Sequence, residues 1–275
     1  MTVIVTVKIN DGIVMASDSA STFQTGQTYL HADKIVNLVK GLPVGVMVTG
    51  NGGIGSESIA TLLKDLRSRL DGSVGHDWKL DPQNYTMHEV AERVRQFLFE
   101  EKALAVETET WMHLRVCGYS ASRPLPEIWD VELRGKTCQP PELLLTETAF
   151  GVNWAGEFDA LDRLILGTGT GFCQAVISDE VSGEDALTLR RKVNTQLYQN
   201  LVVPAMPIQD AIDLARYLVE TTIGFVRFSV FTQPKSVGGP IEIAAITKHE
   251  RFCWVQRRHF YTASLNPSGA PHQTE

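Results

Sequence analysis

The order of its expected elements predicts an α+β fold for this chain, with helices on the faces of mostly antiparallel sheets. Four short strand patterns, at residues 2–9, 13–19, 33–39 and 45–50, come before any helix pattern. Helices, further strands, the longest helix and two last strands follow. Strands and helices that alternate one by one would indicate a parallel sheet instead, and this chain does not have that order.

The four early strands are expected to form two antiparallel hairpins. β-Branched residues flank Asn10, Asp11 and Gly12, which are residue types that tolerate the positive φ angles of tight turns. The second pair of strands is joined around Gly41 and Pro43, which are also typical of turns.

Three later segments, at residues 53–70, 88–105 and 207–228, have the periodicity of amphipathic helices. Ser56 or Ser58 can cap the first of them. The apolar positions on the three faces are Ile59, Leu62, Leu63, Leu66 and Leu70, then Val90, Val94, Phe97 and Leu98, then Ile212, Ala215, Leu218 and Val219.

The remaining segments are short strand patterns and breaks. Strands are expected at residues 113–120, 127–133, 241–248 and 251–257. We interpret Gly135 to Phe158 as irregular, since it contains Pro140 and Pro141, and residues 162–180 as a strand, a Gly/Thr turn and the start of a helix.

Composition indicates an ordinary globular protein. The chain has 275 residues, is 43% hydrophobic and 21% charged, and has a net charge of −7. We interpret residues 1–262 as one domain and the small, polar residues 263–275 as a disordered tail.

Several classes of partner are not expected. No run of Lys or Arg favours nucleic acid or a membrane surface, and no apolar run is long enough to span a bilayer. The four cysteines are scattered without the spacing of a zinc site, so we expect neither a metal nor a cofactor. No leader segment is visible at the N-terminus, and we therefore expect a cytoplasmic protein.

Thr2, the second residue of the chain, is a candidate catalytic nucleophile. Removal of Met1 would give Thr2 a free amine beside its hydroxyl, and a threonine activated by its own amine is a known nucleophile. Such a site also needs a nearby cation, a carboxylate that holds the cation, and backbone N–H groups for the oxyanion. Asp18 and Lys34 lie at strand ends where the hairpins can bring them close to Thr2. The alternative interpretation is an ordinary solvated Asp–Lys pair at a sheet edge.

These residues and their surroundings resemble a β-type proteasome subunit. An Asp sixteen residues and a Lys thirty-two residues after the threonine match that family, within "ASDSAST" and "ADKI". The turns "GVMVTGNGGIG", "LGTGTGF" and "SVGGPIEIAAIT" are also similar and come in the same order. Within the family the chain resembles the bacterial proteasome-like proteins HslV and Anbu.

The resemblance implies a fold and a set of roles. The fold would be the four-layer αββα sandwich of N-terminal nucleophile hydrolases. Thr2 would be the nucleophile, with Lys34 stabilising its oxygen and Asp18 orienting Lys34. The Gly50 N–H would hold the oxyanion, and Thr168 and Ser236 would hold the Thr2 amine. The family often has an Asp just before its late Gly-Gly pair, where this chain has Gln233.

The resemblance also implies a threonine peptidase that cleaves peptides or unfolded proteins inside self-associated rings, two of them stacked. Whether an ATPase partner exists is open. One alternative is a catalytically inactive subunit that only builds the ring. Another is nucleotide binding through Gly50, Gly52 and Gly55, which fit a GxGxxG pattern between a strand and a helix.

Overall fold

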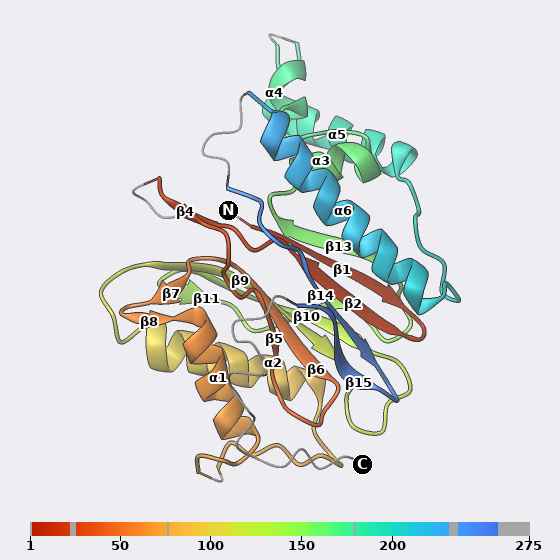
Figure 1. Ribbon diagram of the computed structural model, residues 1–275. Coiled ribbons are helices and arrows are strands. Elements are labelled where there is room, and N and C mark those ends of the chain that lie inside the picture. The colour runs from red at the N-terminus through yellow and green to blue at the C-terminus, as the bar shows by residue number, and fades with distance from the viewer. Residues whose placement is uncertain (1, 23–25, 76, 179, 231–235, 258–275) are drawn as a thin grey trace.

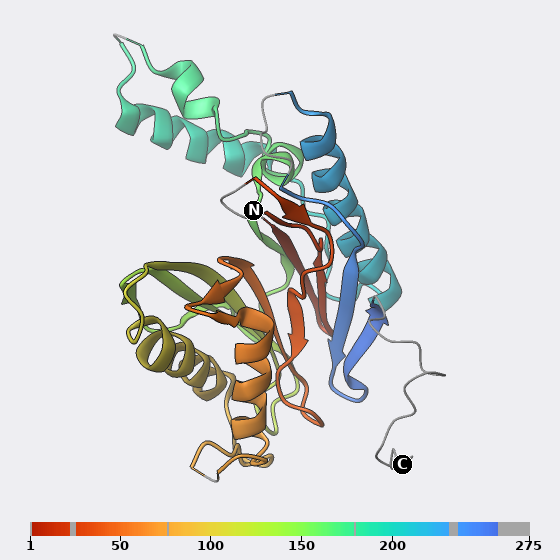
Figure 2. The ribbon, with the colours of Figure 1, turned by 60° about the vertical axis from the view of Figure 1, so that its left-hand side comes forward.

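The computed structural model describes most of the chain, namely residues 2–22, 26–75, 77–178, 180–230 and 236–257. Figures 1 and 2 show its ribbon from two sides. The predicted tail 263–275, Met1 and Gln233 lie outside the described residues.

The first large sheet contains the N-terminal hairpin at its centre. In spatial order its strands are β13 (Gly151–Gly156), β1 (Val3–Ile9), β2 (Gly12–Ser17), β14 (Glu242–Thr247) and β15 (Arg251–Gln256). All neighbouring strands are antiparallel. Ile9 pairs with Gly12 across the turn, so the first predicted hairpin is confirmed.

The second large sheet contains the other predicted hairpin. Its strands in spatial order are β11 (Thr137–Cys138), β10 (Glu127–Gly135), β9 (Thr110–Gly118), β6 (Val44–Gly50) and β5 (Ile35–Asn37), and β12 (Glu142–Leu145) also pairs with β10. β5 and β6 pair antiparallel, with Ile35 opposite Met47, as the sequence predicts.

Each sheet carries helices on one face. On the first sheet, α6 (Ile208–Phe228) packs on β1 and β2, and its buried residues Ala215 and Leu218 share a core with Val5 and Val7. On the second sheet lie α1 (Ile59–Leu70) and α2 (Met87–Arg95), and α2 continues as a π-helical turn, η1 (Gln96–Ala103).

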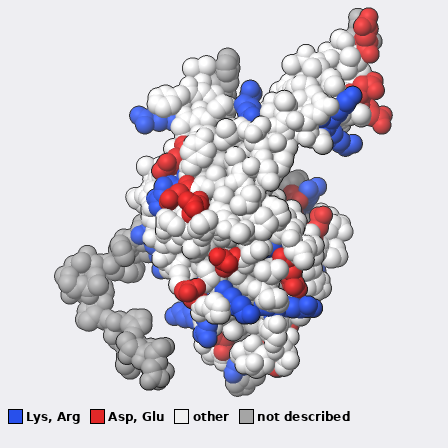
Figure 3. Space-filling model, turned by 90° about the vertical axis from the view of Figure 1, so that its right-hand side faces the viewer, with Lys and Arg blue, Asp and Glu red and all other residues white. Residues whose placement is uncertain are grey.

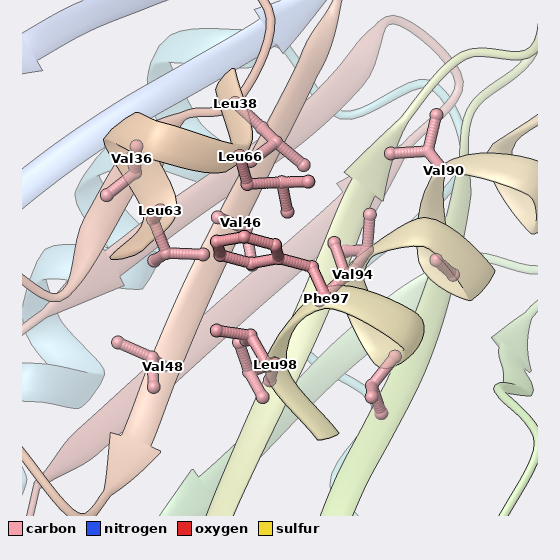
Figure 4. Close-up of a cluster of buried hydrophobic side chains, with 14 of the residues drawn as sticks. Val36, Leu38, Val46, Val48, Leu63, Leu66, Val90, Val94, Phe97 and Leu98 are labelled. Carbon is pink, nitrogen blue, oxygen red and sulfur yellow. The ribbon is translucent and has the colours of Figure 1, made fainter. Parts of the chain in front are cut away.

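The helix faces are the ones that the sequence predicts. All five apolar positions of α1 are buried, and the Ser58 side chain accepts a hydrogen bond from the Thr61 N–H at the start of the helix. Figure 4 shows the Phe97 ring among side chains from both helices and from strand β6. Periodicity therefore identifies the buried face even where the helix changes its winding after Arg95.

A third apolar cluster lies between the two sheets. Ile4 and Met15 come from the first sheet, and Met47, Cys117 and Ile128 come from the second. All five are fully buried. The inner faces of the two sheets thus pack against each other, while their other faces carry the helices.

Two sequence predictions are wrong. The stretch 135–158 is not irregular, because β11, β12 and β13 lie in it. Asp162–Leu166 is not a strand but a π-helical turn, η2, which follows the short helix α3 (Asp159–Leu161). Leu161 and Ile165 lie four residues apart and are buried in the α6 core. A short apolar run does not by itself distinguish a buried helix from a strand.

The remaining elements are short or project from the body. Two small hairpins consist of β3 (Ser21–Thr22) with β4 (Thr28–Tyr29) and of β7 (Gly53–Ile54) with β8 (Glu57–Ser58). Helices α4 (Phe172–Val176) and α5 (Gly183–Leu197) form an arm, and Figure 3 shows acidic side chains at the arm's tip. Among the described residues, no helix has the length and apolar character needed to cross a bilayer.

Candidate functional site

Thr2, Asp18 and Lys34 come together at one end of the two sheets. Thr2 directly precedes β1, Asp18 directly follows β2, and Lys34 directly precedes β5. Their exposed fractions are 5%, 0% and 4%. Because β1 and β2 form a hairpin, the start of one strand and the end of the other lie side by side, and this places Thr2 next to Asp18.

The Asp18 carboxylate is held by four donors. Oδ1 accepts hydrogen bonds from the Val3 N–H (3.0 Å) and from Lys34 Nζ (2.8 Å). Oδ2 accepts from the N–H groups of Ala20 (3.1 Å) and Gly238 (3.0 Å). A buried charge needs such partners, because burial without them is costly. Asp18 is therefore fixed as a buried carboxylate with one defined orientation.

The Lys34–Asp18 ion pair joins the two sheets. Asp18 belongs to the end of β2 in the first sheet, and Lys34 belongs to the start of β5 in the second. The Lys34 carbonyl also accepts the Val48 N–H at 3.0 Å, which ties its backbone to β6. The ammonium is thereby held at the mouth between the sheets rather than in solvent.

Thr2 is held through its backbone. Its carbonyl oxygen accepts the Glu157 N–H at 2.7 Å, directly after β13 ends. Gly156 has a φ of +90°, and a Cβ on this residue would overlap the Thr2 carbonyl oxygen. Only glycine therefore allows the end of β13 to approach Thr2 so closely.

A cleft opens beside these residues. It has a volume of about 870 Å³, and Thr2, Lys34 and Val48 line it. The end of β6, the β6–β7 loop and the start of α1 form another part of its wall, including Gly50 and Ile59. This volume lies within the ~300–1,000 Å³ that small-molecule and peptide side-chain pockets have.

The Gly50 N–H points toward the cleft side of β6. N–H groups alternate in direction along a strand. The Val48 N–H bonds to the Lys34 carbonyl, whereas the Asn51 N–H bonds to the Trp111 carbonyl of β9 on the other side. The Gly50 N–H thus faces the same edge as that of Val48, beyond the point where β5 begins. Gly50 also has a φ of +105°, and a Cβ on it would overlap the Trp111 carbonyl oxygen.

Thr168 and Ser236 have different surroundings. The Thr168 hydroxyl contacts Asn194 and accepts from Arg190 Nε at 3.4 Å, and both partners lie on α5. Thr168 is absent from the residues that line the cleft. Ser236 is 1% exposed, and its Oγ has no hydrogen-bond partner among the described atoms. Two residues further on, Gly238 donates to Asp18.

A second charge cluster, partly buried, lies on strands β9 and β10. His113 Nε2 and Arg115 Nε on β9 each lie 3.0 Å from the Asp130 carboxylate on β10. Burial alone would raise the pKa of Asp130, but the hydrogen bond from His113 and the charge of Arg115 outweigh it and hold that pKa below its ordinary value of 3.8. His113 pairs with Thr49, which lines the cleft.

Sequence reasoning missed Gly156, Glu157 and Gly238, whose backbones hold Thr2 and Asp18. Gly156 ends β13 and Glu157 follows it. This strand has no clear alternation, and its place depends on pairing with β1, more than 140 residues away in the chain. The glycines of "WAGE" and "VGGP" are the one available signal, since glycine permits close backbone approach.

The Gly50–Gly55 turn does not have the form that nucleotide binding requires. The small hairpin of β7 and β8 lies between β6 and α1, and β6 pairs antiparallel with both of its neighbours. A dinucleotide-binding turn instead joins a strand of a parallel sheet directly to a helix. Within the described residues, no group of three or more His, Cys, Asp or Glu side chains could hold a metal ion.

Comparison with solved structures identifies the fold. The helical assembly of the Anbu complex from Pseudomonas aeruginosa aligns with a TM-score of 0.51 and 15% identity, over 96% of this chain and 90% of that one. Anbu (ancestral beta-subunit) from Yersinia bercovieri aligns with a TM-score of 0.51 and 14% identity, over 94% and 89%. No protein-family model matches the sequence. Among curated proteins, no sequence match is found.

The chain therefore has a mixed α+β fold of the kind seen in these ancestral beta-subunit structures. More narrowly, it shares this fold with Anbu, at a sequence identity too low to carry residue roles from one protein to the other.

Proposed function

We propose that this protein is an N-terminal threonine peptidase of the proteasome-like type. The observation that carries the proposal is the buried Lys34–Asp18 pair, which shares a cleft mouth with Thr2. A buried ion pair contributes little to stability compared with a well-packed apolar pair, so its presence at a cleft favours a role in chemistry.

In the proposed reaction, Met1 is removed and the Thr2 amine becomes the general base. An α-amine has an ordinary pKa near ~7.7–8.0, so much of it is neutral at pH 7.5–8. The amine takes the hydroxyl proton, directly or through a water, and Oγ attacks the peptide carbonyl carbon. The leaving amine takes a proton as the peptide bond breaks. Water then hydrolyses the resulting ester and regenerates Thr2.

The neighbouring groups have electrostatic roles. Lys34 stabilises the ionised Thr2 oxygen, and Asp18 keeps Lys34 in position. The Gly50 N–H donates to the oxyanion of the tetrahedral intermediate. Ser236 has a free hydroxyl that can hold the amine, and Thr168 would do so only after leaving Asn194.

Val48 and Ile59 supply apolar area to the cleft wall. We therefore expect cleavage after apolar residues of a peptide or an unfolded protein. In this proposal the two sheets and their helices form the four-layer αββα sandwich of N-terminal nucleophile hydrolases. Subunits associate into rings, two of them stacked, that enclose the clefts. The Anbu complex from Pseudomonas aeruginosa forms a helical assembly, which supports self-association of this fold.

Thr2→Ala tests the proposal directly. The variant should lose at least ~10³-fold in hydrolysis of fluorogenic peptides, because it lacks the hydroxyl that forms the acyl ester. Its assembly, measured by light scattering, should equal that of the unchanged protein. Thr2→Ser is the matched control and should keep measurable hydrolysis. An active Thr2→Ala variant would remove the catalytic proposal.

An inactive ring-building subunit is the second candidate. Two observations favour it: the Thr168 hydroxyl contacts α5, and the Ser236 hydroxyl has no hydrogen-bond partner among the described atoms. Neither of the two hydroxyls expected to hold the Thr2 amine is therefore seen in that role. A protein that assembles fully but hydrolyses no member of a broad peptide library would support this candidate.

A further inference from the structure

A second pocket lies at the opposite end of the sheets from Thr2. Four connections meet there: the β5–β6 turn, the loop between α1 and α2, the β9–β10 turn and the β14–β15 turn. In Figure 1 these connections lie toward the lower end of the molecule, whereas the label of the N-terminus lies higher, beside the start of β1. The pocket has a volume of about 530 Å³.

The lining of this pocket is strongly cationic. Five cationic residues and a single carboxylate, that of Asp71, line it, and the cations are Lys40, Lys79, Arg123, Lys248 and Arg251. The chain as a whole has a charge of −7, so this concentration of positive charge is local. Such a pocket raises the local concentration of anions.

Most of these cations have no anionic partner among the residues that the structure describes. Arg123 lies 3.5 Å from Glu147. Within the described part of the chain, Lys40, Lys79, Lys248 and Arg251 have no carboxylate oxygen within 4.0 Å. These four exposed cations line one hollow in which Asp71 is the single lining carboxylate, so they repel one another and a bound anion would reduce that repulsion.

The floor of the pocket adds hydroxyl donors. Tyr85 and Tyr119 line it and are each 3% exposed. Burial raises the pKa of both phenols to about 12, so both stay protonated and can donate. The Tyr119 hydroxyl donates to the Asp11 carbonyl at 3.2 Å. The Tyr85 hydroxyl makes no hydrogen bond to any described residue and can serve a ligand.

The backbone of the pocket is strained at two places. Ser122 and Arg251 both have a φ of +62°, and they are the two non-glycine residues with positive φ in the described chain. Both line this pocket. Left-handed conformations of such residues are unfavourable and concentrate at functional sites.

We propose that this pocket binds a small oligophosphate, that is, a phosphorylated small molecule with two or more linked phosphate groups. Four unpaired cations suit several negative charges on one compact ligand, and the Arg251 guanidinium can bind phosphate oxygens in a bidentate manner. The volume accommodates a nucleoside polyphosphate. The proposal does not depend on the peptidase proposal, because the two sites share no residue.

Calorimetric titration of the full chain tests the proposal, with pyrophosphate, ATP and adenosine as probes at fixed salt. Pyrophosphate and ATP should bind saturably with one site per chain. The double variant Lys40→Ala/Lys248→Ala, and separately Arg251→Gly, should raise the Kd at least tenfold. Arg251→Gly removes the guanidinium and leaves the left-handed backbone unstrained, so it should fold.

The matched control is Arg191→Ala/Lys192→Ala, which removes two exposed cations from α5 and should leave the Kd unchanged. An equal loss of affinity in that control would indicate non-specific charge attraction and overturn the proposal. The absence of saturable binding, or binding of adenosine as tight as that of ATP, would also overturn it. Thr2→Ala should bind both phosphate probes normally, whether or not the chain is a peptidase.

Discussion

At the scale of single residues, Asp18 connects folding with the proposed chemistry. Three of its four donors are backbone N–H groups from separate parts of the chain, and the fourth is Lys34. A carboxylate with this many donors is anchored before any substrate arrives. The Lys34 residue is only 4% exposed, and Asp18 supplies the opposite charge that a buried ammonium needs.

Lys34→Met tests this dependence. The substitution keeps the length of the side chain but leaves Asp18 as a buried carboxylate without its counter-ion. The free energy of unfolding, from urea titration, should fall by about 3–5 kcal/mol. Peptide hydrolysis should be lost as well. Lys192→Met, at an exposed position on α5, is the control and should change stability by less than about 0.5 kcal/mol. Wild-type hydrolysis in Lys34→Met would contradict the proposed role.

The lowered pKa of Asp130 predicts that the stability of the protein depends on pH. Its pKa in the folded protein lies below the ordinary value, so the folded state binds fewer protons there than the unfolded state. The resulting stabilisation is present above about pH 4 and is lost as pH falls through the folded pKa. Unfolding free energies measured from pH 7 to pH 3 should therefore decline less steeply for Asp130→Asn than for the unchanged protein. Parallel curves would contradict this assignment.

At the scale of elements, β13 is the strand on which the position of Thr2 depends. It pairs with β1 along six residues, from Val3 opposite Gly156 to Lys8 opposite Gly151. Glycine at the end of β13 lets the chain reach the Thr2 carbonyl, and the next N–H then bonds to it. An edge strand remote in sequence thus sets the position of the proposed nucleophile.

Gly156→Ala is expected to displace Thr2. The added Cβ would overlap the Thr2 carbonyl oxygen, so either β13 or the start of β1 must move. We expect kcat to fall at least ~10²-fold, since a shift of about 1 Å is enough for such a loss. Gly151→Ala is the control on the same strand: its φ is also positive, at +144°, but nothing lies within 4 Å of the added Cβ. Equal losses in both variants would point to strain of the strand alone.

Much of the fold was predictable because short-range sequence patterns determine it. The turn at Asn10–Gly12 and the apolar positions of α1 follow from short-range periodicity and turn chemistry. β13 was not predictable in this way. Its central residues are only partly buried, so no alternation marks it, and its place depends on non-local pairing.

In the candidate site, too, some features were predictable from the sequence and others were not. The intervals between Thr2, Asp18 and Lys34 predicted that they belong together, and the structure places Asp18 and Lys34 in direct contact. The supporting N–H groups of Glu157 and Gly238 were not predictable, because any residue type can supply a backbone N–H. The roles of Thr168 and Ser236 stay predictions.

At the scale of the whole molecule, the cleft that Thr2 lines lies at one end of the two sheets, and the cationic pocket lies at the other end. The α4–α5 arm projects from the body, and Ala186 is the one buried residue of α5. Leu187 and Leu189 on α5 are 48% and 41% exposed. In the ring proposal these apolar side chains are contacts for a second copy of the chain, since burying them stabilises association.

The sharpest test of Thr2 as a free N-terminal nucleophile is the intact mass of the purified protein after incubation with a threonine-directed epoxyketone. The reagent forms a ring with both the hydroxyl and the free amine of an N-terminal threonine, so it reports both groups at once. We expect a chain that lacks Met1 and carries one inhibitor, mapped to Thr2. A chain that keeps Met1, or one that lacks Met1 and remains unlabelled, would contradict it.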